Sequence, residues 1–253
     1  MCSYNYYFFN HYMCKKALGL LLLTLLVIPA TAQDDYAFYM SEAGSASLIY
    51  RGRRAFEYPI LFNGTYWWSG PTFKTGEVFY NGKIYRDVQL NIDAARQDLI
   101  VQDPVGLTGK LLAGDLVEYF VIDGTRYLNL RKIYGPEAPG GYWQVLYDGE
   151  KKFVRQVTKQ MVQDMDGSKR SQIGEVYSEY KRNVFNVFIQ NVAYGCVLEN
   201  GEFVPVKRRR HILNIDRERR REVRHHIGVL EARSSMMPIE ILGVEVLKFL
   251  ENR

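Results

Sequence analysis

The densest group of side chains with recognisable chemistry lies at residues 207–226, KRRRHILNIDRERRREVRHH, which hold nine Lys or Arg and three acidic residues. Clustered cations of this kind bind phosphate groups, either of nucleic acid or of lipid head groups. The alternative is a solvated helix face whose charges are balanced by neighbouring carboxylates. The predicted anion-binding residues are Arg208, Arg209, Arg210, Arg219, Arg220 and Arg221.

Aromatic side chains form a second candidate site. The stretch YWWSG at residues 66–70 and the pair Tyr142-Trp143 would provide a flat surface on which a sugar ring could stack. The alternative is that these aromatics are ordinary strand and core residues. The predicted ligand-binding platform consists of Tyr66, Trp67, Trp68, Tyr142 and Trp143.

Acid–base catalysis finds little support. Asp87 and Asp93 are expected on the polar face of one strand, ~20 Å apart at ~3.3 Å per residue. Glycosidase carboxylates lie ~5–9.5 Å apart, so this face is interpreted as the wet side of a sheet. The sequence also lacks a G-x-S-x-G motif, a phosphate loop and a dinucleotide fingerprint. We therefore predict no catalytic residues and favour a protein that is not an enzyme.

Metal and cofactor sites are not predicted either. Adjacent helical residues diverge by ~100°, so His225 and His226 are poorly placed to share one metal ion. Residues 164–175, DMDGSKRSQIGE, approach a calcium loop, but Lys169 stands where that loop requires glycine. Cys196 is expected to be a buried, inert thiol.

The first 32 residues have the features of a secretory signal peptide. Lys15 and Lys16 precede an apolar run that ends in Ala30-Thr31-Ala32, a signal-peptidase pattern. The residues before Met13 fit no signal peptide, so Met13 is the expected start of translation. Removing residues 1–32 removes two Lys and no acid, which lowers the formal net charge from +5 to +3. We predict export to the periplasm or the outer cell surface, with no lipid anchor, no transmembrane segment after cleavage and no nucleic-acid partner.

The elements that would position these side chains are mostly strands. Turn signals recur at Asn81-Gly82, Asp123-Gly124, Asp148-Gly149 and Asn200-Gly201 between alternating runs. They predict an antiparallel β meander, built as a twisted sheet or a partly closed barrel. The expected strands are 76–80, 83–93, 99–103, 116–122, 125–130, 142–148 and 151–158, with two or three more within 183–206.

The first hairpin can be assigned residue by residue. With Asn81-Gly82 as the turn, Phe79 faces Ile84 and Glu77 faces Arg86, which would form an ion pair. Strict alternation then predicts one apolar face and one polar face. The predicted apolar face carries Phe79, Ile84, Val88, Leu90 and Ile92, and the predicted polar face carries Tyr85, Asp87, Gln89, Asn91 and Asp93.

The end of the chain has helical spacing. Residues 216–234 place Val223, Ile227 and Leu230 on one face, with Asp216 as a possible N-cap. Residues 237–253 predict a second helix. We expect these helices, within 212–253, to pack on the sheet of a single β-rich domain at residues 33–253.

The order of the segments resembles a group of exported proteins of Bacteroidetes-type bacteria. The resemblance rests on GEVFYNGKIYRDVQLNIDAARQDLIV, DLVEYFVIDGTRYLNL and GYWQVLYDGEKKFVRQVTK, and it covers roughly residues 60–253. It implies a β-rich envelope protein, and it brings no activity, cofactor or catalytic residue to any position of this chain.

The function expected from these observations is a non-enzymatic binding or scaffolding role in the cell envelope, with an unknown ligand. The alternatives are an enzyme acting on envelope glycans and a carrier of an apolar ligand such as a lipid. Clustered carboxylates beneath Trp67 and Trp68 would favour the enzyme. A continuous apolar cavity between sheet and helices would favour the carrier, and a filled core would favour the scaffold.

Overall fold

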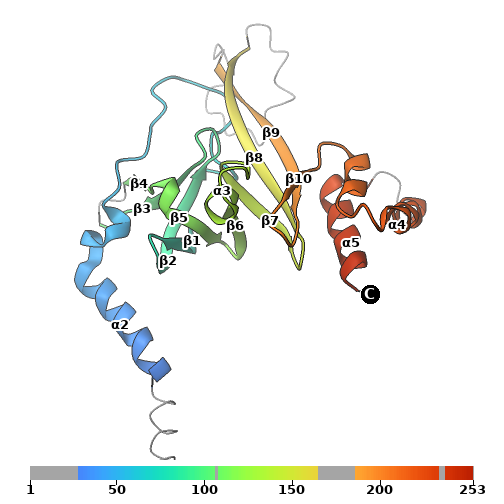
Figure 1. Cartoon of the computed structure of the whole chain (residues 1–253). Helices are drawn as coiled ribbons and strands as arrows, with labels where there is room; N and C mark the ends of the chain where they lie inside the picture. The colour runs from blue at the N-terminus through green and yellow to red at the C-terminus, as the bar shows by residue number, and fades with distance from the viewer. Residues whose placement is uncertain (1–27, 106–107, 165–185, 234–236, 253) are drawn as a thin grey trace, which may run out of the picture. The chain divides into compact units, whose positions relative to one another are not determined.

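The computed structural model describes residues 28–105, 108–164, 186–233 and 237–252 (Figure 1). The chain divides into two compact units, Met1–Ser47 and Leu48–Arg253. In the first unit, helix α2 (Ile28–Ala43) is followed by a 3-10 turn, η1 (Gly44–Ala46). The predicted signal peptide lies outside the described residues as far as residue 27, and its expected cleavage site at Ala30-Thr31-Ala32 falls within α2.

The second unit begins with a 3-10 turn, η2 (Leu48–Tyr50), and its described residues contain ten strands in one antiparallel sheet. Their order is β10-β9-β8-β7-β6-β5-β1-β2-β3-β4, so β5 pairs with β1 and not with β4. The strands are β1 (Lys74–Tyr80), β2 (Lys83–Asp93), β3 (Asp98–Gln102), β4 (Gly109–Leu111), β5 (Val117–Ile122), β6 (Thr125–Asn129), β7 (Tyr142–Asp148), β8 (Lys152–Gln163), β9 (Asn186–Val197) and β10 (Phe203–Pro205). The structure thereby confirms the prediction of a mainly β, antiparallel protein.

Two of the four turn signals form the tight hairpins expected of them. Asn81 and Gly82 have φ values of 50° and 76°, and Asp123 and Gly124 have 51° and 74°. Both positions of a type I′ turn need positive φ, and Asn, Asp and Gly tolerate it best. The connections at Asp148-Gly149 and Asn200-Gly201 are wider, because β7 pairs with β8 from Asp148 to Lys152 and β9 pairs with β10 from Val197 to Phe203.

The first hairpin contains a bulge that the sequence analysis missed. Val78 pairs with Tyr85 as predicted, but Gly76 pairs with Val88. Asp87 has φ 56°, and the side chains beyond it change face. The buried face therefore holds Tyr85 together with Val88, Leu90 and Ile92, while Ile84 is only half-buried. The predicted face was therefore wrong for Phe79, Ile84 and Tyr85. Asn91 and Asp93 lie opposite Leu90 and Ile92 as predicted, but they are buried and not exposed to water.

Gly76 lies opposite the bulge, where the backbones of β1 and β5 approach closely. A Cβ at this position would lie 2.0 Å from the carbonyl oxygen of Val121. The predicted ion pair across the hairpin does form, with Arg86 Nε 4.0 Å from Glu77 Oε2.

Residues 51–73 form an irregular strap that follows the sheet. At β4, Ala55 N donates to Gly109 O at 2.9 Å. At the end of β2, Trp68 N donates to Ile92 O at 3.0 Å, and Asn63 N reaches Asn186 O on β9 at 2.8 Å. The strap therefore links β2 and β4 to β9, which lies near the other end of the strand order.

The open, twisted sheet curls until the turn after β2 reaches β8. Lys159 N donates to Ala94 O at 3.1 Å, and the side-chain amide of Gln97 donates to Val157 O at 2.9 Å. Beyond the end of β7, this turn thus takes the place of a neighbouring strand.

The C-terminal region consists of a 3-10 helix, η5 (Arg209–Asn214), and helices α4 (Arg220–Arg233) and α5 (Ile239–Glu251). Figure 1 shows α4 and α5 beside the β7–β10 half of the sheet. The apolar faces of both helices pack in one core. Its buried members are Phe153, Cys196, Val206, Ile212, Ile215, Val223, Leu242, Val246, Leu247 and Leu250. Asp216 is not the N-cap of α4, since its carboxylate accepts the N–H of Arg219 one turn earlier.

The opposite face of the same strands carries a second core. Helix α3 (Leu130–Tyr134) and the residues that follow it cover Leu128, Trp143, Val154 and Val197. In the described part of the chain, no helix is long and apolar enough to cross a membrane.

Candidate functional site

The candidate site is a set of cations on the outside of the C-terminal region, here named the arginine surface. Its members are Lys207, Arg208, Arg210, Arg217, Arg220, Arg221 and Arg224. All are exposed, and none forms an ion pair with a carboxylate of the described residues. Elsewhere in this unit, cations such as Arg126 and Lys152 do have such partners.

The local sequence explains why these cations face outward. Ile212, Ile215 and Val223 alternate with the charged residues and are buried in the core beneath the helices. Burial of an apolar side chain is favoured by roughly 1.5–3 kcal/mol, so these three residues fix the inward side of η5 and α4. The arginines between them are left on the solvent side.

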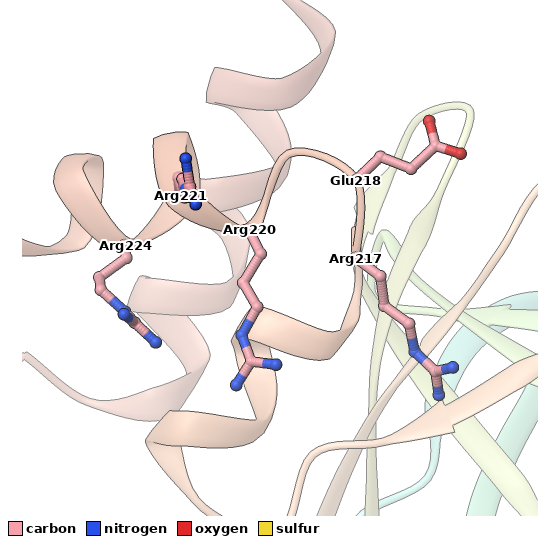
Figure 2. Close-up of a pocket in the computed structure, with 5 residues that line it drawn as sticks. All are labelled: Arg217, Glu218, Arg220, Arg221 and Arg224. Atoms are coloured by element: carbon pink, nitrogen blue, oxygen red, sulfur yellow. The ribbon is translucent and has the colours of Figure 1, made fainter.

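Part of the arginine surface lines a depression of ≈ 450 Å³, whose lining residues are Arg217, Glu218, Arg220, Arg221 and Arg224. Figure 2 shows Arg217, Arg220 and Arg224 extending toward the same side, while Glu218 points the other way. The start of α4 adds the partial positive charge of a helix N-terminus. A planar guanidinium group can donate two parallel hydrogen bonds to two oxygens of one phosphate, so this depression is suited to a phosphate-bearing ligand.

Two of the predicted anion-binding residues form ion pairs with carboxylates of this chain. Arg209 pairs with Glu231 at 2.6 Å. Arg219 pairs with Glu222 at 3.2 Å, donates to Leu250 O at 2.9 Å and lies over the Phe249 ring. These two arginines hold η5 and α5 against α4 and are not part of the exposed surface.

Arg217 and Arg224 were not predicted as anion-binding residues, and they join Arg220 and Arg221 in the depression. One signal was available, because Arg220 and Arg224 are four residues apart and so are neighbours on a helix. Arg208 and Arg210 are exposed, as expected, but lie outside the depression.

The five aromatic residues predicted to form a platform are not gathered on one exposed surface. Trp68, Tyr142 and Trp143 are core residues with exposures of 8, 2 and 3 %. Tyr142 packs against Phe120, and Trp143 packs against Phe203 in the separate core on the other face of the sheet. Only Tyr66 and Trp67 remain half-exposed, with their rings 4.6 Å apart.

Tyr66 belongs to an aromatic cluster around Asp93, which is buried rather than solvated. The carboxylate accepts hydrogen bonds from the backbone N–H groups of Ala95 (2.8 Å) and Arg96 (3.0 Å) and from the Tyr58 hydroxyl (3.1 Å). Burial raises the pKa of Asp93, and these hydrogen bonds oppose the shift only in part. Burial and the same carboxylate raise the pKa of Tyr58.

These contacts attach the strap to the sheet. Asn91, also buried, donates to Gly70 O and Thr72 O at 3.0 and 3.3 Å, and Lys159 Nζ donates to Trp67 O at 2.5 Å. Asp87, the other carboxylate of this hairpin, is exposed at the bulge and shares no site with Asp93. The cluster therefore supplies one buried acid, whose hydrogen bonds hold chain segments together.

The remaining candidates show no metal geometry. Among the residues that the structure describes, no group of three His, Cys, Asp or Glu side chains could hold a metal ion. His226 stacks on Phe249 with ring centroids 4.2 Å apart, and His225 is exposed. The calcium-like loop falls outside the described residues beyond Asp164. Cys196 is a fully buried thiol, as predicted, and burial raises its pKa to about 12.

Comparison with known proteins leaves the site to be interpreted from its own geometry. No protein-family model, no curated protein and no solved structure matches this chain.

Proposed function

We propose that this protein is a non-enzymatic binding protein of the cell envelope, and that its arginine surface holds a phosphate-bearing anionic partner. The observation that carries the proposal is the depression lined by four arginines without carboxylate partners in the described residues. Like charges held close together raise the free energy of the folded protein, and a bound anion relieves this repulsion. The signal-peptide pattern of residues 1–32 supports an envelope location.

The two alternative functions lack a supporting observation in the described residues. Near Trp67, Asp93 is a single buried carboxylate that is occupied by structural hydrogen bonds. Between the sheet and α5, the space is filled by side chains such as Phe153, Leu242 and Val246. A filled core here is the observation expected of a scaffold and not of a carrier.

The proposal is tested by removing the charges of the depression. The variant carries Arg217→Gln, Arg220→Gln, Arg221→Gln and Arg224→Gln in a chain that begins at Gln33. An exposed ion pair contributes roughly 0.2–1 kcal/mol, so losing four contacts should weaken binding to inorganic polyphosphate about tenfold or more. Isothermal titration calorimetry at low salt measures the change.

A matched control removes four cations from other parts of the second unit, through Arg53→Gln, Lys83→Gln, Lys110→Gln and Lys132→Gln. The net charge changes equally in both variants, so the control should bind polyphosphate within about twofold of the parent protein. Equal losses in both variants would mean that net charge alone attracts the anion. Equal losses, or no binding by the parent protein, would overturn the proposal.

A further inference from the structure

The solvent-facing side of α4 continues the arginine surface beyond the depression. At ~100° per residue, one side of the helix holds Arg221, Arg224, His225, Gly228 and Ala232. All five residues are exposed. The opposite side, with Val223, Ile227 and Leu230, packs in the core. The exposed side thus has cations in its first half and small side chains in its second half.

Acidic residues are confined to the flanks of this exposed side. Glu222 pairs with Arg219, and Glu231 pairs with Arg209. Both carboxylates are therefore neutralised by arginines that do not belong to the arginine surface. The solvent-facing side of α4 carries positive charge with no acid along ~16 Å of helix between Arg221 and Ala232.

We infer that the partner is an anionic membrane surface, on which α4 lies parallel to the plane of the lipid phosphates. This inference rests on the proposed function and names the partner of the same site. Three observations favour a flat partner. The depression is formed by exposed side chains, further exposed cations lie outside it at Lys207, Arg208 and Arg210, and the second half of the helix face carries small side chains. A Cβ added to Gly228 would meet no atom within 4 Å.

The energetics also favour an extended partner over a single small anion. Exposed guanidinium groups are screened by water and salt, so one phosphate gains little from them. On an anionic bilayer each cation near the surface raises the partition coefficient by roughly fivefold, and several cations act together.

The inference is tested by co-sedimentation with vesicles of 30 % phosphatidylglycerol in phosphatidylcholine, and with pure phosphatidylcholine vesicles, at low and high salt. The parent chain from Gln33 should bind only the anionic vesicles, and ~0.5 M salt should release it. The variant with Arg217, Arg220, Arg221 and Arg224 replaced by Gln should lose at least about tenfold in partitioning.

Ala232 provides the variant that separates a flat membrane from a small anion. It lies ~12 Å along the helix from Arg224, beyond the screening length at physiological salt, and it does not line the depression. Ala232→Glu should weaken vesicle binding about fivefold, and Ala232→Gln should leave it unchanged. At physiological salt, both variants should bind polyphosphate like the parent protein.

Each outcome discriminates between the two claims. Polyphosphate binding without vesicle binding would overturn the membrane inference and leave the proposed function standing. If the parent protein bound neither polyphosphate nor vesicles, both the proposed function and the membrane inference would be overturned. Equal vesicle binding by Ala232→Glu and Ala232→Gln would refute the placement of α4 on the membrane. Tighter binding to a 20-base-pair DNA duplex than to the anionic vesicles, at the same salt, would identify nucleic acid as the partner instead.

Discussion

Asp93 shows how one residue joins distant parts of this protein. Its carboxylate closes the turn after β2 through two backbone N–H groups and fixes Tyr58 of the strap, 35 positions away in sequence. Tyr58 in turn packs against Tyr66 and Phe188, at ring-centroid distances of 4.4 and 5.2 Å. Because burial raises the pKa of Asp93, the protonated carboxyl is favoured more in the folded chain than in the unfolded one.

Substitutions of Asp93 should distinguish the stabilisation that comes from its hydrogen bonds from the effect of its charge. Asp93→Ala leaves buried donors without an acceptor and should lower the free energy of unfolding by about 1–3 kcal/mol. Asp93→Asn keeps an acceptor and should cost less than half as much. Urea unfolding followed by fluorescence measures both values.

The pH dependence of stability in the parent protein and in Asp93→Asn gives a second measurement. The folded-state pKa of Asp93 is raised. The stabilisation that comes from its protonated carboxyl group is therefore fully present below the ordinary pKa of 3.8 and is lost as pH rises through the raised pKa. The stability of the parent protein relative to Asp93→Asn should therefore fall across that window. A difference that is constant with pH would contradict the raised pKa.

At the scale of elements, helix α5 is held to the sheet by polar contacts at both ends. Near its start, Glu240 accepts from Arg155 at 2.7 Å and from the Tyr194 hydroxyl at 2.8 Å. At its end, Glu251 accepts from the Tyr147 hydroxyl at 2.7 Å. Apolar residues between these ends pack on Phe153. The polar contacts fix where along the sheet the helix lies, since burial alone has no direction.

Glu240→Gln should destabilise the protein by about 0.5–1 kcal/mol, because it removes the charge that Arg155 and Tyr194 contact. Glu245→Gln on the same helix is the matched control. Among the described residues Glu245 forms an ion pair with Lys248 alone, at the surface, and the loss should be below about 0.5 kcal/mol. Thermal and urea unfolding provide the comparison.

The effect of Glu240 should also depend on pH. Burial raises its pKa, but hydrogen bonds from Arg155 and Tyr194 outweigh burial, and the net pKa is lowered. The stabilisation is therefore present above the ordinary value of 4.5 and is lost as pH falls through the lowered value. If Glu240→Gln and the parent protein lose stability in parallel on acidification, the charged contact does not contribute.

At the scale of the whole second unit, the β7–β9 strands are covered on both faces. One face meets η5, α4 and α5, and the other meets α3 and the residues after it. The outer cations of the arginine surface are carried by the helical layer, which depends on the sheet beneath it. Binding and stability are therefore linked through one shared core.

The reactivity of Cys196 indicates whether the helical layer is packed on the sheet. Cys196 is buried between β9 and the helices and is the single thiol after residue 32. A chain from Gln33 that ends at residue 233 lacks α5 and exposes Phe153 and Cys196. Its thiol should react with a disulfide reagent under native conditions, whereas the parent thiol should react only on unfolding. A protected thiol in the shortened chain would show that α5 is not needed for this core.

The sequence by itself determined the local features. Asn81-Gly82 and Asp123-Gly124 favour tight turns whatever surrounds them, alternation marks the strands, and spacing marks the two final helices. The density of cations at residues 207–226 was also legible. These signals are readable because each depends on residues only a few positions apart.

Tertiary structure decided which side chains are buried and which cations stay unpaired. The bulge at Asp87 accompanies a close approach of β1 to β5 at Gly76, some 45 positions from Val121. Asp93 is buried where Tyr58 and Trp67 of the strap contact it. Arg209 does not belong to the arginine surface because it pairs with Glu231, 22 positions away. Such contacts join segments that are far apart in the sequence. The local pattern of residues does not say which distant segments meet, so only the folded chain determines these contacts.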